Sequence, residues 1–239
     1  MVAPSAFAAV FDRLDGLPLP VAARELARAG VAVFPCVPGE KTPIVASGFR
    51  RATTDPHQVA QWWRWQPSAN IGIPTGAVSG LVVIDVDVHG VDGYAAYARA
   101  ARAGLIPAPL ATVTTPTGGR HAYFPAVPAR VQRSWAVGKA GVDCRGDGGY
   151  VIAPPSTLRL EATSVSYRVE QVAAGAVAPV DAVRLRDFLD PPPPRRPGRE
   201  GGQASGRENA DRLAAWLSRQ IKGDRNYKLF WAACRLAEG

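Results

Sequence analysis

The stretch at residues 80–87, GLVVIDVD, most constrains what this chain can fold into. Four consecutive apolar residues follow Gly80, and a His-Gly pair follows the stretch, which together indicate a β-strand. Because polar and apolar residues do not alternate along it, the pattern predicts a strand buried on both faces, at the centre of a sheet.

Two carboxylates, Asp85 and Asp87, stand at the end of this strand. Side chains alternate between the faces of a strand, so both should project from one face, roughly 6–7 Å apart. A cation between them relieves their repulsion, and Mg²⁺ and Mn²⁺ prefer carboxylate oxygens. The alternative is a strand that runs into a solvated acidic turn, and for an isolated Asp-x-Asp this alternative is favoured.

The composition of the chain limits its class. It has 239 residues, of which 47% are hydrophobic and 20% charged, as in ordinary globular proteins. No apolar run is long enough to predict a membrane span, and charged residues interrupt the first 20, so we expect neither a membrane protein nor a signal peptide. The three cysteines lie far apart, which predicts no zinc site and no disulfide framework and fits a cytoplasmic protein.

The net charge of +8 is distributed unevenly. Residues 191–239 hold ten Lys and Arg against five Asp and Glu, a net +5, while residues 1–190 carry +3. Such a balance suits a polyanionic partner. An Arg-rich composition inherited from a GC-rich genome explains the charge equally well.

The pattern of the chain predicts one domain, a linker and the start of a second region. Residues 1–190 alternate short strands with helices. The pattern predicts a helix at 21–29 that ends at Gly30, a segment at 70–76 that leads by a turn into the central strand, and a strand at 164–169. The most distinct element is a helix that begins at Asp55-Pro56 and carries three tryptophans expected to serve mainly in packing. Residues 191–206 are rich in Pro, Gly and Arg and indicate a linker. Residues 207–239 predict a short helical tail, which either docks on the main domain or is the start of a larger helical region.

Further chemistry-bearing residues fall on strands that we expect beside the first. His121 follows the turn of a predicted hairpin, and Asp143 lies on a short strand before a glycine-rich loop. Three carboxylates on adjacent strands can hold two divalent metal ions, and Lys41, Arg120 and Arg145 can meet a triphosphate. Alone, His121 is more simply an ordinary strand histidine, and Asp143 a turn cap.

The order of these pieces resembles the bifunctional DNA primase/polymerase (prim-pol) domain of the archaeo-eukaryotic primase superfamily, which plasmids, phages and integrated elements encode. The resemblance covers about residues 20–190. It rests on five segments, namely GEKTP at 39–43, NIGIPTG at 70–76, VIDVD at 83–87, TPTGGRHAYF at 115–124 and VDCRGDGGYVIAPPS at 142–156.

The resemblance implies an α/β (α+β) fold in which a small α/β unit packs on a catalytic core like the RNA-recognition motif (RRM), followed by a short α-helical tail. It also implies that a 3′-hydroxyl attacks the α-phosphate of an incoming NTP or dNTP on a single-stranded DNA template, and that pyrophosphate leaves. Asp85, Asp87 and Asp143 would hold two Mg²⁺ or Mn²⁺ ions, and His121 would contact the triphosphate. A helicase often follows such a domain, so a helicase domain or partner is expected.

Two departures from the family pattern affect the expected contacts. Many superfamily members have Ser two residues before the histidine, where this chain has Gly119, so that phosphate contact must come from backbone or from Thr117. The zinc-binding insertion of some members is also absent from the sequence. Separately, the positive charge of the tail leads us to expect that its basic residues meet template phosphate, namely Arg207, Arg212, Lys222, Arg225 and Lys228.

Two other functions use the same residues. A metal-dependent nuclease could use the same carboxylates, and a non-catalytic replication-initiation module would only bind DNA. The complete set of acidic residues argues against the second.

Overall fold

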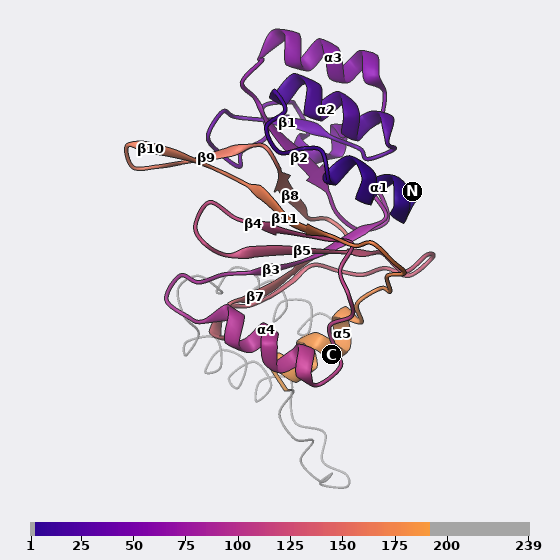
Figure 1. Ribbon diagram of the computed structural model, residues 1–239, viewed down its shortest axis with the longest axis vertical. Coiled ribbons are helices and arrows are strands. Elements are labelled where there is room, and N and C mark those ends of the chain that lie inside the picture. Colours follow the sequence, from indigo (N-terminus) through magenta and orange to yellow (C-terminus); the bar gives the residue numbers. More distant parts are fainter. Residues whose placement is uncertain (1–2, 192–239) are drawn as a thin grey trace, which may run out of the picture. The chain divides into compact units, whose positions relative to one another are not determined.

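A computed structural model describes residues 3–191 of the chain (Figure 1). Its helices are α1 (Pro4–Phe11), α2 (Leu19–Arg28), α3 (Pro56–Trp65), α4 (Gly93–Arg102) and α5 (Ala182–Leu189), with 3₁₀ turns η1 (Gly48–Arg51) and η2 (Gly138–Ala140). None of the helices in this part of the chain is long and apolar enough to cross a membrane. The predicted tail at 207–239 and all but the first residue of the predicted linker lie outside the described residues.

The largest sheet has six antiparallel strands in the order β11-β4-β5-β3-β7-β6. Its strands are β3 (Leu81–Val86), β4 (Ala111–Thr114), β5 (Arg120–Pro125), β6 (Trp135–Val137), β7 (Val142–Arg145) and β11 (Arg168–Val172). The predicted central strand is β3, which pairs with β5 on one side and β7 on the other and is buried along almost its whole length. The predicted central strand, buried on both faces, is confirmed over residues 81–86, and it ends one residue before Asp87.

The connections of this sheet confirm the expected RRM-like core. β3, α4, β4 and β5 follow one another, and β7 then pairs with the free side of β3. The resulting order β4-β5-β3-β7 is the split arrangement of ferredoxin-like domains. β11 and β6 extend the sheet at its two edges.

The two faces of the six-stranded sheet belong to different hydrophobic clusters. Val82, Ile84 and Phe124 pack with α4 and α5 on one face. Val83 and Tyr123, which alternate with them, join the cluster that includes α1 and α2 on the other face. Figure 1 shows α4 and α5 on the side of the sheet opposite to α1–α3. Burial on both faces explains why the sequence of β3 is continuously apolar.

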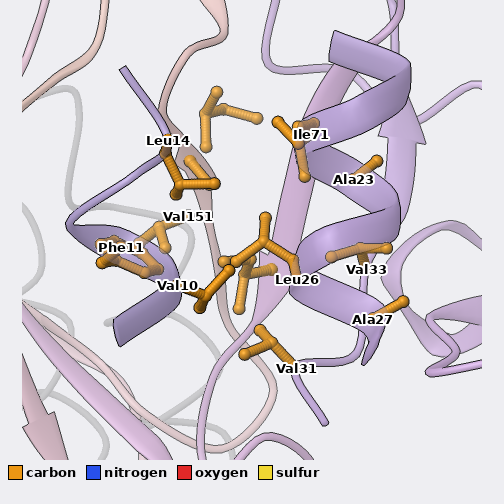
Figure 2. Packing of buried hydrophobic residues seen from close by; sticks show 14 of the residues in the cluster. Val10, Phe11, Leu14, Ala23, Leu26, Ala27, Val31, Val33, Ile71 and Val151 are labelled. Carbon is orange, nitrogen blue, oxygen red and sulfur yellow. The ribbon is translucent and has the colours of Figure 1, made fainter. Parts of the chain in front are cut away.

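The small α/β unit is built on a three-stranded sheet in the order β1-β2-β8, with β1 (Phe34–Cys36), β2 (Asn70–Pro74) and β8 (Tyr150–Ala153). Leu26 of α2 packs with Ile71 and Val151, as Figure 2 shows. From α1, the ring of Phe11 lies 5.0 Å from that of Tyr123, so α1 connects this unit to the six-stranded sheet.

Local signals set the helix ends as predicted. Asp55 accepts a hydrogen bond from the backbone N–H of His57 at the start of α3, and Gly30 follows α2 with a φ of +85°. Within α3, Trp62 and Trp63 are buried as expected of packing residues, whereas Trp65 is 69% exposed.

The main difference from the expected elements lies between residues 157 and 172. The sequence predicts one strand at 164–169, but the structure has a hairpin of β9 (Thr157–Leu160) and β10 (Thr163–Ser166), followed by β11. Tyr167, whose side chain is buried in the core, lies between β10 and β11. Helix α1 was also not predicted, and residues 70–74, expected as a lead into a turn, form strand β2.

Candidate active site

Asp85, His121 and Asp143 lie on one face of the six-stranded sheet, side by side on three neighbouring strands. Asp85 is the register partner of His121 on β5 and of Asp143 on β7. Directly opposed residues on adjacent strands have Cβ atoms about 4.5–5.5 Å apart. The expected grouping of these three residues is therefore what the strand pairing produces.

One arginine bridges the two carboxylates. Nη2 of Arg145 lies 2.9 Å from Oδ2 of Asp143 and 3.4 Å from Oδ2 of Asp85. Burial raises the pKa of Asp143; Arg145 opposes this shift and Asp85 adds to it, and the pKa remains above its ordinary value. Without a nearby cation, two acidic groups so placed would repel each other.

The paired carboxylates fit a divalent metal ion. Their Oδ2 atoms both contact one nitrogen of Arg145, so the position of that nitrogen is one in which both carboxylates stabilise a positive charge. Oxygen donors of this kind are those that Mg²⁺ and Mn²⁺ take. Within residues 3–191, however, no group of three or more His, Cys, Asp or Glu side chains is arranged to hold a metal.

Asp87 is the member of the predicted triad that does not join the pair. It follows the last residue of β3, and its Oδ1 accepts hydrogen bonds from the backbone N–H groups of Val88 and His89, at 2.7 and 3.0 Å, and lies 2.7 Å from Nδ1 of His89. Although partial burial raises its pKa, the bonds with His89 and Val88 lower it, and the pKa lies below its ordinary value. To bind a metal beside Asp85, this carboxylate must leave its own turn.

His121 is a buried, neutral histidine. Burial lowers its pKa, and the charges of Lys41 and Arg145 add to that effect, while Asp85 opposes it. Its Nε2 lies 3.5 Å from Oδ1 of Asp85, and its Nδ1 has no hydrogen-bond partner among the described residues. Because Nδ1 is itself buried, Nε2 is the ring nitrogen that can exchange a hydrogen bond with a ligand entering beside Asp85.

A cavity of about 330 Å³ opens beside these residues. Asp85, His121 and Arg145 line it from the six-stranded sheet, and residues 148–152 line it from the loop before β8 and from β8 itself; Lys41, Ser134 and Tyr167 complete the wall. The cavity thus joins two basic side chains, hydroxyl groups and glycine backbone, which together suit a phosphorylated ligand.

Asn70 holds the Lys41 loop in place. Its side chain is fully buried, and its Nδ2 donates to the carbonyls of Glu40 and Thr157, at 2.8 and 2.6 Å, while its Oδ1 accepts from the N–H of Thr157 at 3.1 Å. Tyr150 also donates to the carbonyl of Lys41. The sequence pattern singled out the segment that contains Asn70 but gave that side chain no role.

Asp147 holds the glycine-rich loop that lines the cavity. Its carboxylate accepts from the backbone N–H of Ala77 at 2.8 Å and from that of Gln132 at 2.6 Å, so it joins three loops. Thr75 and Ser134 bond the backbone of Gly146 in the same place. Sequence reasoning assigned no role to Asp147 either, since its partners lie up to 70 residues away.

Three residues predicted to bind nucleotide do not line the cavity. Arg120 points to the other face of β5, where it forms a bidentate ion pair with Glu170 and lies over the ring of Tyr94. Thr117 lies at the turn of the β4–β5 hairpin, with its Oγ1 3.3 Å from that of Thr115. Gly119 packs so tightly that an added Cβ would clash with the carbonyl oxygen of Val86.

The five tail residues predicted to contact template lie outside the described residues. They are Arg207, Arg212, Lys222, Arg225 and Lys228.

The fold and the site define a class of α/β domain in which a split antiparallel sheet presents paired carboxylates beside a basic cavity. Residues 23–183 match the family described as bifunctional DNA primase/polymerase, N-terminal. Because the match covers more than half of the chain, the chain belongs to this Prim-Pol family. A comparison with curated proteins found no match.

Proposed function

We propose that this chain is a DNA primase/polymerase that starts strands de novo on single-stranded DNA and extends them by metal-dependent nucleotidyl transfer. Membership of the Prim-Pol family supports nucleotidyltransferase activity with a DNA template and nucleotide substrates. The observation that carries the finer proposal is the register of Asp85 with both His121 and Asp143, beside a cavity that suits a triphosphate.

The carboxylates would hold the metal. Asp85 and Asp143 already share one cationic partner, and Asp87 would join them after release from its turn. When bound, two Mg²⁺ or Mn²⁺ ions stabilise the charge that develops on the attacking and leaving oxygens of the displacement. The role of the three carboxylates is to fix that charge next to the α-phosphate.

The cavity would bind the incoming nucleotide. Lys41 and Arg145 are placed to neutralise its phosphates, and the backbone of Gly148 and Gly149 can approach them closely. Neutral His121 can donate a hydrogen bond to a phosphate oxygen without adding a charge beside Asp85. We retain the phosphate-binding proposal for Lys41, Arg145 and His121, whose side chains line the cavity, and not for Arg120, which is paired elsewhere.

A labelled single strand incubated with Mg²⁺ or Mn²⁺, with and without nucleotides, separates the three candidate functions. Primase/polymerase activity predicts that new strands form on the intact labelled template, and only when nucleotides are present. A template that shortens without nucleotides identifies a nuclease, and a template that is bound but neither cut nor copied identifies a DNA-binding module.

The contribution of His121 is measured in parallel. His121→Ala should weaken nucleotide binding while DNA binding stays similar. The proposed phosphate contact is wrong if nucleotide affinity is unchanged in this variant.

A further inference from the structure

Arg145 occupies the position that the proposed metal site requires. Its Nη2 contacts Oδ2 of Asp143 and Oδ2 of Asp85 at the same time, and both carboxylates are only partly exposed. A divalent metal ion that bridges these two Oδ2 atoms would fill the place that Nη2 of Arg145 now occupies. A cation bound in that position must therefore displace Arg145.

Arg145 also has a second place to go. Its side chain is 39% exposed and lines the same cavity as Lys41, Gly148 and Gly149, where the triphosphate is proposed to bind. An arginine side chain is long enough to turn from a carboxylate to a phosphate oxygen, and both are anions that it binds through paired N–H groups.

We infer that Arg145 exchanges partners during loading: it neutralises Asp85 and Asp143 in the free protein and moves to the nucleotide's triphosphate when metal takes its place. This inference rests on the proposed function. In the absence of nucleotide, Arg145 competes with metal for the two carboxylates. In the presence of nucleotide, Arg145 binds the triphosphate.

Partner exchange couples the two binding steps. Metal binding frees Arg145 for the triphosphate, and the triphosphate, by holding Arg145, leaves the carboxylates open for metal. By linkage, each ligand then strengthens the binding of the other by the same factor. Arg145 thereby disfavours a metal-loaded site that holds no nucleotide.

The test is a titration of the full chain with Mn²⁺ in the absence of nucleotide, with free Mn²⁺ followed by electron paramagnetic resonance. Arg145→Gln should bind Mn²⁺ about tenfold more tightly than the wild type, which corresponds to about 1.4 kcal/mol. Arg145→Lys, which keeps a positive charge but loses the planar fork, should lie between the two.

Lys41→Gln is the matched control. It removes one positive charge from the same cavity, but among the described residues Lys41 makes no ion pair with a carboxylate. A much smaller rise in affinity for Lys41→Gln than for Arg145→Gln supports displacement. An equal rise in the two variants shows general electrostatics only and overturns the inference, as does wild-type affinity in Arg145→Gln.

Asp85→Asn distinguishes this inference from the proposed function. Loss of Mn²⁺ binding in this variant supports a metal site at the carboxylate pair, independently of the result for the Arg145 variants. Mn²⁺ binding as tight as that of the wild type places the metal elsewhere, and both the metal assignment and the exchange by Arg145 are then wrong.

Discussion

Replacing Asn70 should destabilise the domain strongly although the side chain touches no substrate. Its side chain makes three hydrogen bonds to backbone groups of two other segments. At about 0.5–1.5 kcal/mol net for each bond, Asn70→Ala should cost about 1.5–4.5 kcal/mol. For a domain of this size, 3 kcal/mol lowers Tm by about 6–12 °C.

Asn70→Asp tests the direction of these bonds with almost no change of shape. Two carbonyl oxygens that now accept from Nδ2, at 2.8 and 2.6 Å, would face a carboxylate oxygen instead. Repulsion should make this variant at least as unstable as Asn70→Ala. Because the carbonyl of Glu40 is released next to Lys41, nucleotide affinity should also fall at temperatures where the variant stays folded.

Ser79→Ala is the matched control for the removal of a buried polar side chain. Ser79 is buried, but its hydroxyl has no hydrogen-bond partner in the described part of the chain. Its removal should leave Tm unchanged or raise it slightly. Thermal unfolding followed by circular dichroism measures all three variants, and a Tm within about 2 °C of the wild type for both Asn70 variants would refute the reasoning.

Three further predictions concern single residues. Gly119→Ala should lower the free energy of unfolding, measured by urea denaturation, by about 1–3 kcal/mol, because the added Cβ meets a backbone carbonyl of β3. Gly138→Ala is the control and should be neutral, because a Cβ there has no neighbour within contact distance. Burial raises the pKa of Cys36 and of Cys144 to about 12, so neither thiol should react in the folded protein at pH 8. In a variant with the third cysteine replaced by serine, a chromogenic disulfide reagent at pH 8 should label the denatured chain only. Fast labelling of the folded chain would contradict this. Burial lowers the pKa of His121 below 6.5, so its contribution to stability is present above pH 6.5 and is lost as the pH falls toward the folded-state pKa. His121→Asn should therefore lose less stability than the wild type over that interval. Parallel plots of unfolding free energy against pH for the variant and the wild type would contradict this.

The parts of the fold that local sequence determines could be predicted from it. The continuous apolar run of β3 marked a strand buried on both faces, and Asp55-Pro56 marked the start of α3. The hairpin that carries His121 was also visible in its turn residues. In each case the responsible residues lie within a few positions of the element that they define.

The parts that depend on distant contacts could not be predicted. Asn70 forms hydrogen bonds with Thr157, 87 residues away, and Asp147 with Ala77, 70 residues away. No local sequence pattern predicts such a pair. Asp87 was expected beside Asp85 because strand geometry was extended one residue past the end of β3.

The position of Arg120 could have been foreseen. Neighbouring residues of a strand point to opposite faces, so Arg120 and His121 cannot both face the same cavity while they lie within β5. Arg145, which is two residues from Asp143 on β7, satisfies the same rule and lines the cavity.

Synthesis on an unprimed template tests the central claim most directly. The full chain is incubated with circular single-stranded DNA, labelled NTPs and dNTPs, and Mg²⁺ or Mn²⁺, beside an Asp85→Asn variant of matched thermal stability. We predict new labelled strands with the wild type and none with the variant. Absence of product from the wild type on this unprimed template, or equal synthesis by Asp85→Asn, would contradict the account.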